Sequence, residues 1–155
     1  MLLMDLLSEE LVRTELAAST RDGVLGELID VLVAGGALAE EAREGALKAV
    51  IKREERQSTG VGGGVAIPHG TCADVDEIVA ALGVHRGVDF ASIDDAPVQL
   101  VILLLVPPNH LQAHIRTLAG IARVLNDPEL RNQLVAAPSA GALIDLLIER
   151  EEATA

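Results

Sequence analysis

The chain has 155 residues, of which half are hydrophobic and only one, Phe90, is aromatic. Its formal net charge of −12 argues against binding to a nucleic-acid backbone, because such binding needs clustered lysine and arginine side chains. The length fits one domain spanning residues 1–155 around an aliphatic core.

The sequence shows neither a signal peptide nor a membrane-spanning segment. The first ten residues, MLLMDLLSEE, lack the basic region of a signal peptide. The longest apolar run, Val98 to Val106, is far shorter than the roughly 20 residues of a membrane span. A lone cysteine, Cys72, excludes an intramolecular disulfide and is typical of a reducing compartment. We therefore expect a cytoplasmic protein.

The first third of the chain predicts an edge strand and two helices. Partial alternation over residues 11–18 favours a short edge strand. Thr20 is a suitable N-cap for a helix with apolar residues at helical spacing, and Gly35 and Gly36 stand where that helix would end. A second helix is expected from about Glu40 to Arg53.

The second half of the chain alternates strands and helices. Strands are predicted at residues 77–84 and 98–106, and the latter is apolar on both faces, so we expect it to be central and covered on each side. A helix capped by Asn109 follows, and two shorter helices are predicted from near Pro128 and Ser139. This order indicates a three-layer α/β domain.

The segment STGVGGGVAIPHG, residues 58–70, places five glycines around His69. It lacks the lysine of a Walker motif and the third small residue of a dinucleotide fingerprint, so neither nucleotide site is expected. Val65–Ile67 favours a short strand. Pro68 keeps the preceding residue extended and Gly70 frees the backbone that follows. His69 is therefore expected at a strand end, in a position that the backbone sets.

The histidines also allow a second interpretation, a metal site. His110 and His114 are four residues apart on the predicted helix, a spacing that zinc ligands often use. The sequence between them, LQA, lacks the glutamate of the metalloprotease motif. We expect no metal, with His110 solvated and His114 facing inward. A metal-dependent hydrolase that uses His69, His110 and His114 remains an alternative.

Three segments together resemble a known family. REERQSTGVGGGVAIPHG, FASIDDAPVQLVILLLVPP and HIRTLAGIARVL, which begin at Arg53, Phe90 and His114, resemble the enzyme IIA domains of the fructose/mannitol class. These belong to the phosphoenolpyruvate-dependent sugar phosphotransferase system, and the class includes nitrogen-regulatory IIA proteins. The resemblance runs from about Leu6 to Ile148 and implies helices on both sides of a central mixed sheet.

The resemblance also implies roles for individual residues. His69 matches the phosphoryl-accepting histidine, His114 the second active-site histidine, Arg53 the arginine beside the phosphate, and Thr59 the threonine of the Ser-Thr-Gly motif. Backbone N–H groups of the glycine turn are expected to add donors to the phosphate. The supporting residues are accordingly expected to be Thr59, Gly60, Gly62 and Gly70.

The residue types fit phosphoryl relay. A neutral imidazole is a competent nucleophile near pH 7, and an arginine presents a planar fork of donors to phosphate oxygens. We expect a phosphotransferase component without a cofactor that accepts phosphate on His69 from HPr or a paralogue and passes it to an enzyme IIB domain. Contact with a membrane is expected only through a transporter complex. The alternative is a regulatory protein whose phosphorylation state controls binding to other proteins, without onward transfer.

Overall fold

The computed structural model describes residues 3–109 and 111–154. Short 3₁₀ turns lie before β1 at Leu3–Asp5 (η1) and Glu9–Leu11 (η2), and between α1 and α2 at Glu40–Ala42 (η3). The helices are α1 (Arg21–Ala34), α2 (Arg43–Arg56), α3 (Leu111–Leu125), α4 (Pro128–Ala136) and α5 (Ala140–Thr154). The strands are β1 (Val12–Arg13), β2 (Gly60–Gly62), β3 (Val65–Ala66), β4 (His69–Thr71), β5 (Val79–Val88) and β6 (Val98–Val106).

The strands of the described residues form one mixed sheet in the order β1-β5-β6-β3-β2, with β4 also paired to β6. β5 and β6 are antiparallel, whereas β3 and β4 both run parallel to β6. The predicted strand at residues 98–106 is confirmed to the residue, and its central place is confirmed as well.

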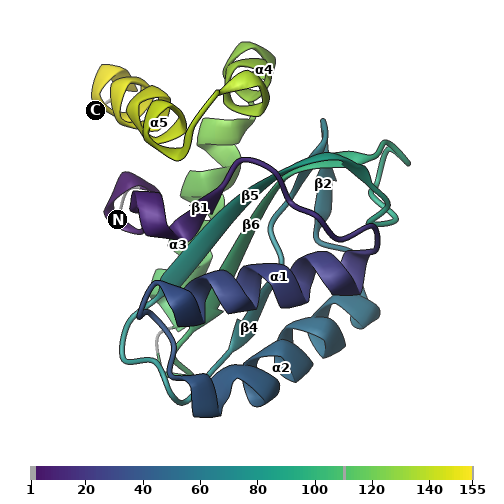
Figure 1. The fold of residues 1–155 in the computed structure, drawn as a ribbon, viewed down its shortest axis with the longest axis vertical. Helices are drawn as coiled ribbons and strands as arrows, with labels where there is room; N and C mark the ends of the chain where they lie inside the picture. The colour runs from purple at the N-terminus through teal and green to yellow at the C-terminus, as the bar shows by residue number, and fades with distance from the viewer. Residues whose placement is uncertain (1–2, 110, 155) are drawn as a thin grey trace.

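Side chains of β6 alternate between two hydrophobic cores. Val101, Leu103 and Leu105 pack with α1 and α2, and the intervening residues Ile102 and Leu104 pack with α3, α4 and α5. All five are essentially inaccessible to solvent, and burying each such side chain stabilises the fold by about 1.5–3 kcal/mol. Figure 1 shows α1 and α2 side by side across one face of the sheet. The three-layer α/β/α prediction is confirmed.

Helix boundaries follow the local signals in part. The hydroxyl of Thr20 accepts a hydrogen bond from the N–H of Gly23 at 3.1 Å, which confirms the predicted N-cap. Gly36, with φ of +77°, follows the end of α1 as expected. α2 begins later than predicted and continues to Arg56, so Arg53 lies within its last turn. α5 is as long as α3, and the prediction of a short final helix was wrong.

The predicted strand over residues 11–18 is shortened to β1 at the edge of the sheet. Beyond it, the N–H groups of Ala17 and Ala18 donate to the carboxylate of Glu27 in α1 instead of to a neighbouring strand. An acidic side chain therefore ends the ladder that the alternating pattern predicted.

His69 begins a strand that the sequence pattern did not predict. β3 and β4 continue along the same side of β6, and Pro68 stands between them. Proline has no N–H to donate, but its carbonyl accepts a hydrogen bond from the N–H of Leu104 at 2.9 Å. The chain thus passes the proline and pairs with β6 again, with His69 opposite Leu104.

Among the described helices, none combines the length and the apolar character that crossing a bilayer requires.

Candidate active site

His69 is half-buried and has one ring nitrogen committed to the backbone. Its Nδ1 lies 2.9 Å from the carbonyl oxygen of Ile67. A carbonyl only accepts hydrogen bonds, so Nδ1 carries the proton and donates it. In the neutral ring the lone pair then stands on Nε2. The site therefore presents a nucleophilic nitrogen of defined identity.

His114, from α3, lies against this imidazole. The two ring centroids are 4.9 Å apart and the ring planes are inclined at 69°, an edge-to-face arrangement. Nε2 of His114 is buried and has no hydrogen-bond partner among the described residues. An unpaired buried nitrogen of this kind costs about 1–3 kcal/mol, and a hydrogen bond to a bound group would remove that cost. His114 faces inward, as predicted.

Arg53 contributes the positive charge of the site. It lies in the last turn of α2, and its Nη1 donates to the carbonyl oxygen of Gln57 at 2.7 Å. The charge of its guanidinium lowers the pKa of both histidines. Burial lowers the pKa of His69 below its ordinary value of 6.5, the hydrogen bond to Ile67 opposes this, and the charge of Arg53 lowers it further.

The pKa of His114 is also lowered, first by burial, then by the neighbouring His69 and by Arg53. Both imidazoles are therefore neutral near pH 7. Two neutral rings and one guanidinium form a site that is ready to receive an anion, and one ring can act as a nucleophile.

Gly70 explains how these groups meet. The glycine is buried in β4 and packs against Val50 and Ala49 of α2. Among the described strands β4 pairs with β6 alone, and α2 packs against β4. His114 comes from α3 in the opposite layer, so the site combines residues of both helical layers on either side of β4.

Thr59 was expected to support the phosphate, but its side chain is bound to a carboxylate. Its hydroxyl donates to one carboxylate oxygen of Glu54 at 2.6 Å, and its backbone N–H donates to the other at 2.7 Å. Because the single hydroxyl proton is used in this way, Thr59 does not offer it to a phosphate. Glu54 is only 2% exposed. No role was predicted for Glu54, whose one signal in the sequence is its place directly after Arg53 and shortly before Ser-Thr-Gly.

The glycine N–H groups also differ from the prediction. The N–H of Gly60 donates to the hydroxyl of Ser58 at 3.0 Å, and the N–H of Gly63 donates to the carboxylate of Asp94 at 3.0 Å. Asp94 also accepts from the N–H of Ala96 at 3.1 Å, so its side chain shapes the turn. The N–H groups of Gly60 and Gly63 are thus already paired within the protein.

Strand register places the glycine turn away from the imidazole. Val65 lies opposite Leu100 of β6, whereas His69 lies opposite Leu104. Four residues of parallel strand span about 13 Å at roughly 3.3 Å per residue. Gly62, which pairs with Val65, therefore lies well removed from His69, and the structure does not support its expected place beside the phosphate.

Of the two histidines that a zinc site would use, only His114 can be described, because His110 lies outside the described residues. In the part of the chain that the structure describes, no three His, Cys, Asp or Glu side chains gather as a metal site. The absence of a metal stays a prediction.

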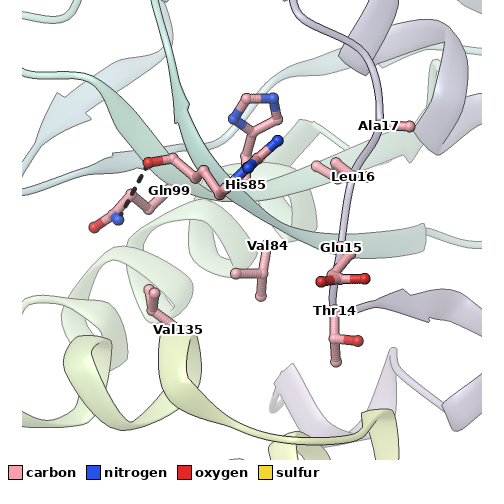
Figure 2. Close-up of a pocket in the computed structure, with 9 residues that line it drawn as sticks. Thr14, Glu15, Leu16, Ala17, Val84, His85, Gln99 and Val135 are labelled. Carbon is pink, nitrogen blue, oxygen red and sulfur yellow. Dashed lines mark hydrogen bonds between the residues drawn. The ribbon is translucent and has the colours of Figure 1, made fainter.

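A cavity of about 580 Å³ lies beside the start of β6, at the end of the strand away from Leu104. Figure 2 shows Val84, Gln99 and Val135 around it, with residues 14–17 along one side. His85 also lines the cavity, but its Nε2 donates to the carbonyl oxygen of Ala18 and its Nδ1 accepts from the N–H of Gly87. Both ring nitrogens of His85 are therefore occupied within the protein.

Known proteins share both sequence and fold with this chain. Residues 5–150 match the family model described as "Phosphoenolpyruvate-dependent sugar phosphotransferase system, EIIA 2". A fructose-specific EIIA component from Haloferax volcanii is 33% identical over 141 residues, which are 90% of each chain. A fructose-specific EIIABC component from Bacillus subtilis is 30% identical over 153 residues, and the match covers 98% of this chain but 24% of that protein.

The crystal structure of the nitrogen regulatory protein IIA-Ntr from Neisseria meningitidis superimposes with a TM-score of 0.83 at 27% identity, over 93% of this chain and 97% of that one. The match to the family model extends over nearly the whole chain and includes every residue of the histidine site. The chain therefore belongs to the EIIA 2 family of the phosphoenolpyruvate-dependent sugar phosphotransferase system.

Proposed function

We propose that this protein accepts a phosphoryl group from HPr or a paralogue on Nε2 of His69 and passes it to an enzyme IIB domain. The observation that carries the proposal is the hydrogen bond from Nδ1 of His69 to the carbonyl of Ile67, which leaves Nε2 as the nucleophile. Membership of the EIIA 2 family supports it. The proposal places the protein in the cytoplasm, where it reaches a membrane only through a transporter complex.

The proposed transfer needs no proton movement at the nucleophile. The lone pair of Nε2 attacks phosphorus, the new nitrogen–phosphorus bond forms, and the donor atom leaves with the electron pair of its own bond to phosphorus. Nδ1 keeps its proton throughout. The phosphorylated ring then carries a positive charge, which the carbonyl of Ile67 stabilises through the hydrogen bond from Nδ1. Transfer to IIB reverses these steps.

The remaining residues position and neutralise the phosphoryl group. Little covalent chemistry is left to the protein in phosphoryl transfer beyond the nucleophile, and charge stabilisation accounts for most of the catalysis. Arg53 supplies a fixed positive charge. Nε2 of His114, which has no partner among the described residues, donates to a phosphoryl oxygen in the tautomer that carries its proton there.

The test is phosphorylation with enzyme I, HPr and phosphoenolpyruvate, followed by intact-mass measurement. We expect one phosphate per chain, loss of labelling in His69→Ala, and normal labelling in His85→Ala, which serves as a control for removing a histidine elsewhere. Labelling of His69→Ala at the rate of the wild type would overturn the assignment. Incubation of the purified phosphoprotein with a IIB domain then tests onward transfer.

A second candidate function is regulatory. The likeness to the IIA-Ntr protein of Neisseria meningitidis favours a protein whose phosphorylation state controls its binding to regulatory proteins, without onward transfer. Capture of partners with wild-type protein in its phosphorylated and unphosphorylated forms tests this. Equal capture in both states counts against regulation, and phosphate transfer to a cognate IIB domain favours the carrier.

A further inference from the structure

A chain of hydrogen bonds joins a buried carboxylate to the ring of His69. The carboxylate of Glu54 accepts both hydrogen bonds that Thr59 donates, from its N–H and from its hydroxyl. The carbonyl of Thr59 accepts from the N–H of Ile67 at 3.1 Å. The carbonyl of Ile67 in turn accepts from Nδ1 of His69 at 2.9 Å.

We infer that Glu54 is a positioning residue for His69, which fixes through Thr59 and Ile67 the carbonyl that holds the proton on Nδ1. The inference rests on the proposed function, because it matters for transfer only if Nε2 of His69 is the acceptor. Glu54 itself touches neither the imidazole nor any phosphoryl group.

Burial makes this link stiff. Glu54 is 2% exposed and Thr59 is 6% exposed, so water does not compete for the two hydrogen bonds. Both oxygens act as acceptors, one for each donor of Thr59, and a single residue is thereby held at two points. The position of the Thr59 carbonyl, and with it the N–H of Ile67, follows from this double attachment.

The same helical turn also holds the preceding residues. Arg53 donates to the carbonyl of Gln57 at 2.7 Å, while its neighbour Glu54 binds Thr59. Two consecutive residues of α2 therefore fasten the segment that leads out of the helix. Arg53, which supplies the charge of the site, and Glu54, which orients its nucleophile, are thus adjacent residues of α2.

This arrangement controls which ring nitrogen of His69 carries the proton. A free imidazole favours the proton on Nε2, and a ring in that form has its lone pair on Nδ1 and cannot attack through Nε2. The carbonyl of Ile67 reverses the preference when it lies in line with Nδ1. If the segment loosens, the population of the reactive tautomer falls, even when the domain stays folded.

The test is the ring ¹⁵N spectrum of His69 in unphosphorylated protein at a pH of about 8, where the imidazole is neutral. The wild type should show a protonated Nδ1 and a bare Nε2. Glu54→Ala should show a mixture of tautomers and accept phosphate roughly tenfold more slowly, the scale on which small misplacements of a reacting group act.

Glu54→Gln should restore both properties, because its amide oxygen accepts from the N–H of Thr59 and its amide nitrogen donates to the hydroxyl. If Glu54→Ala does not fold, Thr59→Val replaces it, since this change removes the hydroxyl and keeps the N–H. An unaltered spectrum of His69 in the folded variant would overturn the inference.

Glu151 provides a matched control. It is also 2% exposed, and its carboxylate accepts from the N–H groups of Leu3 at 2.8 Å and Met4 at 2.7 Å. Glu151→Ala should lower the melting temperature and leave the spectrum of His69 unchanged. An equal change of tautomer in this variant would assign the effect to general loosening and refute the role of Glu54.

The two claims fail separately. Phosphorylation on a residue other than His69 would remove the proposed function, but the spectrum of unphosphorylated protein would still decide whether Glu54 controls the ring. An unchanged spectrum in Glu54→Ala, with normal labelling of His69, would remove only the inference.

Discussion

Gly70 of β4 lies directly against Val50 of α2. A Cβ atom on Gly70 would stand 3.1 Å from Cγ2 of Val50 and 3.2 Å from its backbone nitrogen. The helix therefore approaches the strand about as closely as a glycine permits. Because Arg53 follows Val50 by one helical turn, this approach sets how near the guanidinium comes to the ring of His69.

Gly70→Ala should force α2 outward by a few tenths of an ångström. We expect the free energy of unfolding to fall by about 1–3 kcal/mol from overpacking, and phosphorylation to slow by roughly tenfold because Arg53 moves with the helix. Thermal melts and labelling rates measure the two effects.

Gly45→Ala is the control on the same helix, since a Cβ there meets nothing within 4 Å. It should stabilise the protein by about 0.5–1 kcal/mol and leave labelling unchanged. Full labelling activity in Gly70→Ala would contradict the link between this contact and the position of Arg53.

His114→Ala should impair transfer far more than stability. We expect labelling to slow roughly a hundredfold, as when one preorganised donor to a developing charge is lost. The free energy of unfolding should change by less than about 1 kcal/mol, because the lost ring contact is offset by removal of an unpaired buried nitrogen. A large drop in melting temperature with normal labelling would instead give His114 a structural role.

Arg53→Ala should slow phosphorylation at least tenfold without unfolding the domain. The protein loses one hydrogen bond, from Nη1 to the carbonyl of Gln57, which contributes about 1 kcal/mol. Arg53→Lys should be intermediate, since an ammonium keeps the charge but not the planar fork. Arg56→Ala, an exposed change in the same helical turn, is the control, and equal slowing there would argue against a specific role for Arg53.

Acceptor activity should persist at low pH further than an ordinary histidine would allow. Burial and the charge of Arg53 lower the pKa of His69 below 6.5. The ring is therefore still mostly neutral at pH 6.5, and it gains a proton and loses its free lone pair only at lower pH. Single-turnover transfer from purified phosphorylated HPr and an NMR titration of the ring measure this.

Arg53→Gln should raise the pKa of His69, because one of the causes that lower it is removed. The activity profile should then shift toward higher pH, and a shift toward lower pH would contradict the assignment. By the same sign, the lowered pKa gives His69 a contribution to stability that is present above pH 6.5 and is lost as the pH falls through the folded value.

Zinc should be well below one atom per chain after purification without chelators. The described residues hold no cluster of three metal-ligating side chains, and the two rings of the site lie edge to face. Elemental analysis checks this, with His69→Ala as the comparison. Stoichiometric zinc that disappears in that variant would favour the metal-dependent hydrolase.

Local signals in the sequence predicted the starts of α1, α4 and α5 and the central strand. Thr20 caps α1, Asp127 caps α4 directly before Pro128, and the hydroxyl of Ser139 accepts from the N–H of Ala142 at the start of α5. Each of these contacts joins residues two or three apart, so composition and spacing suffice to anticipate them. The resemblance to the enzyme IIA class predicted His69, His114 and Arg53, which the structure brings together.

Contacts between distant segments were beyond such signals. The location of Gly62 depends on how β3 aligns with β6, a register that no short motif encodes. Pro68 suggested that the strand ended there, and only its pairing with Leu104 shows that the chain continues. The hydrogen bond between Glu54 and Thr59 forms only because the chain turns between the two residues. In the sequence, Glu54 looks like an ordinary surface glutamate, yet it is buried.

Arg53 comes from the layer of α1 and α2, His114 comes from the layer of α3, and His69 stands on the sheet between them. A chain with either layer detached would keep its imidazole but lose the guanidinium or the second ring beside it. Under the proposed function, acceptance of phosphate therefore requires both layers to be packed on the sheet. Phosphorylation would then report that the whole domain is folded.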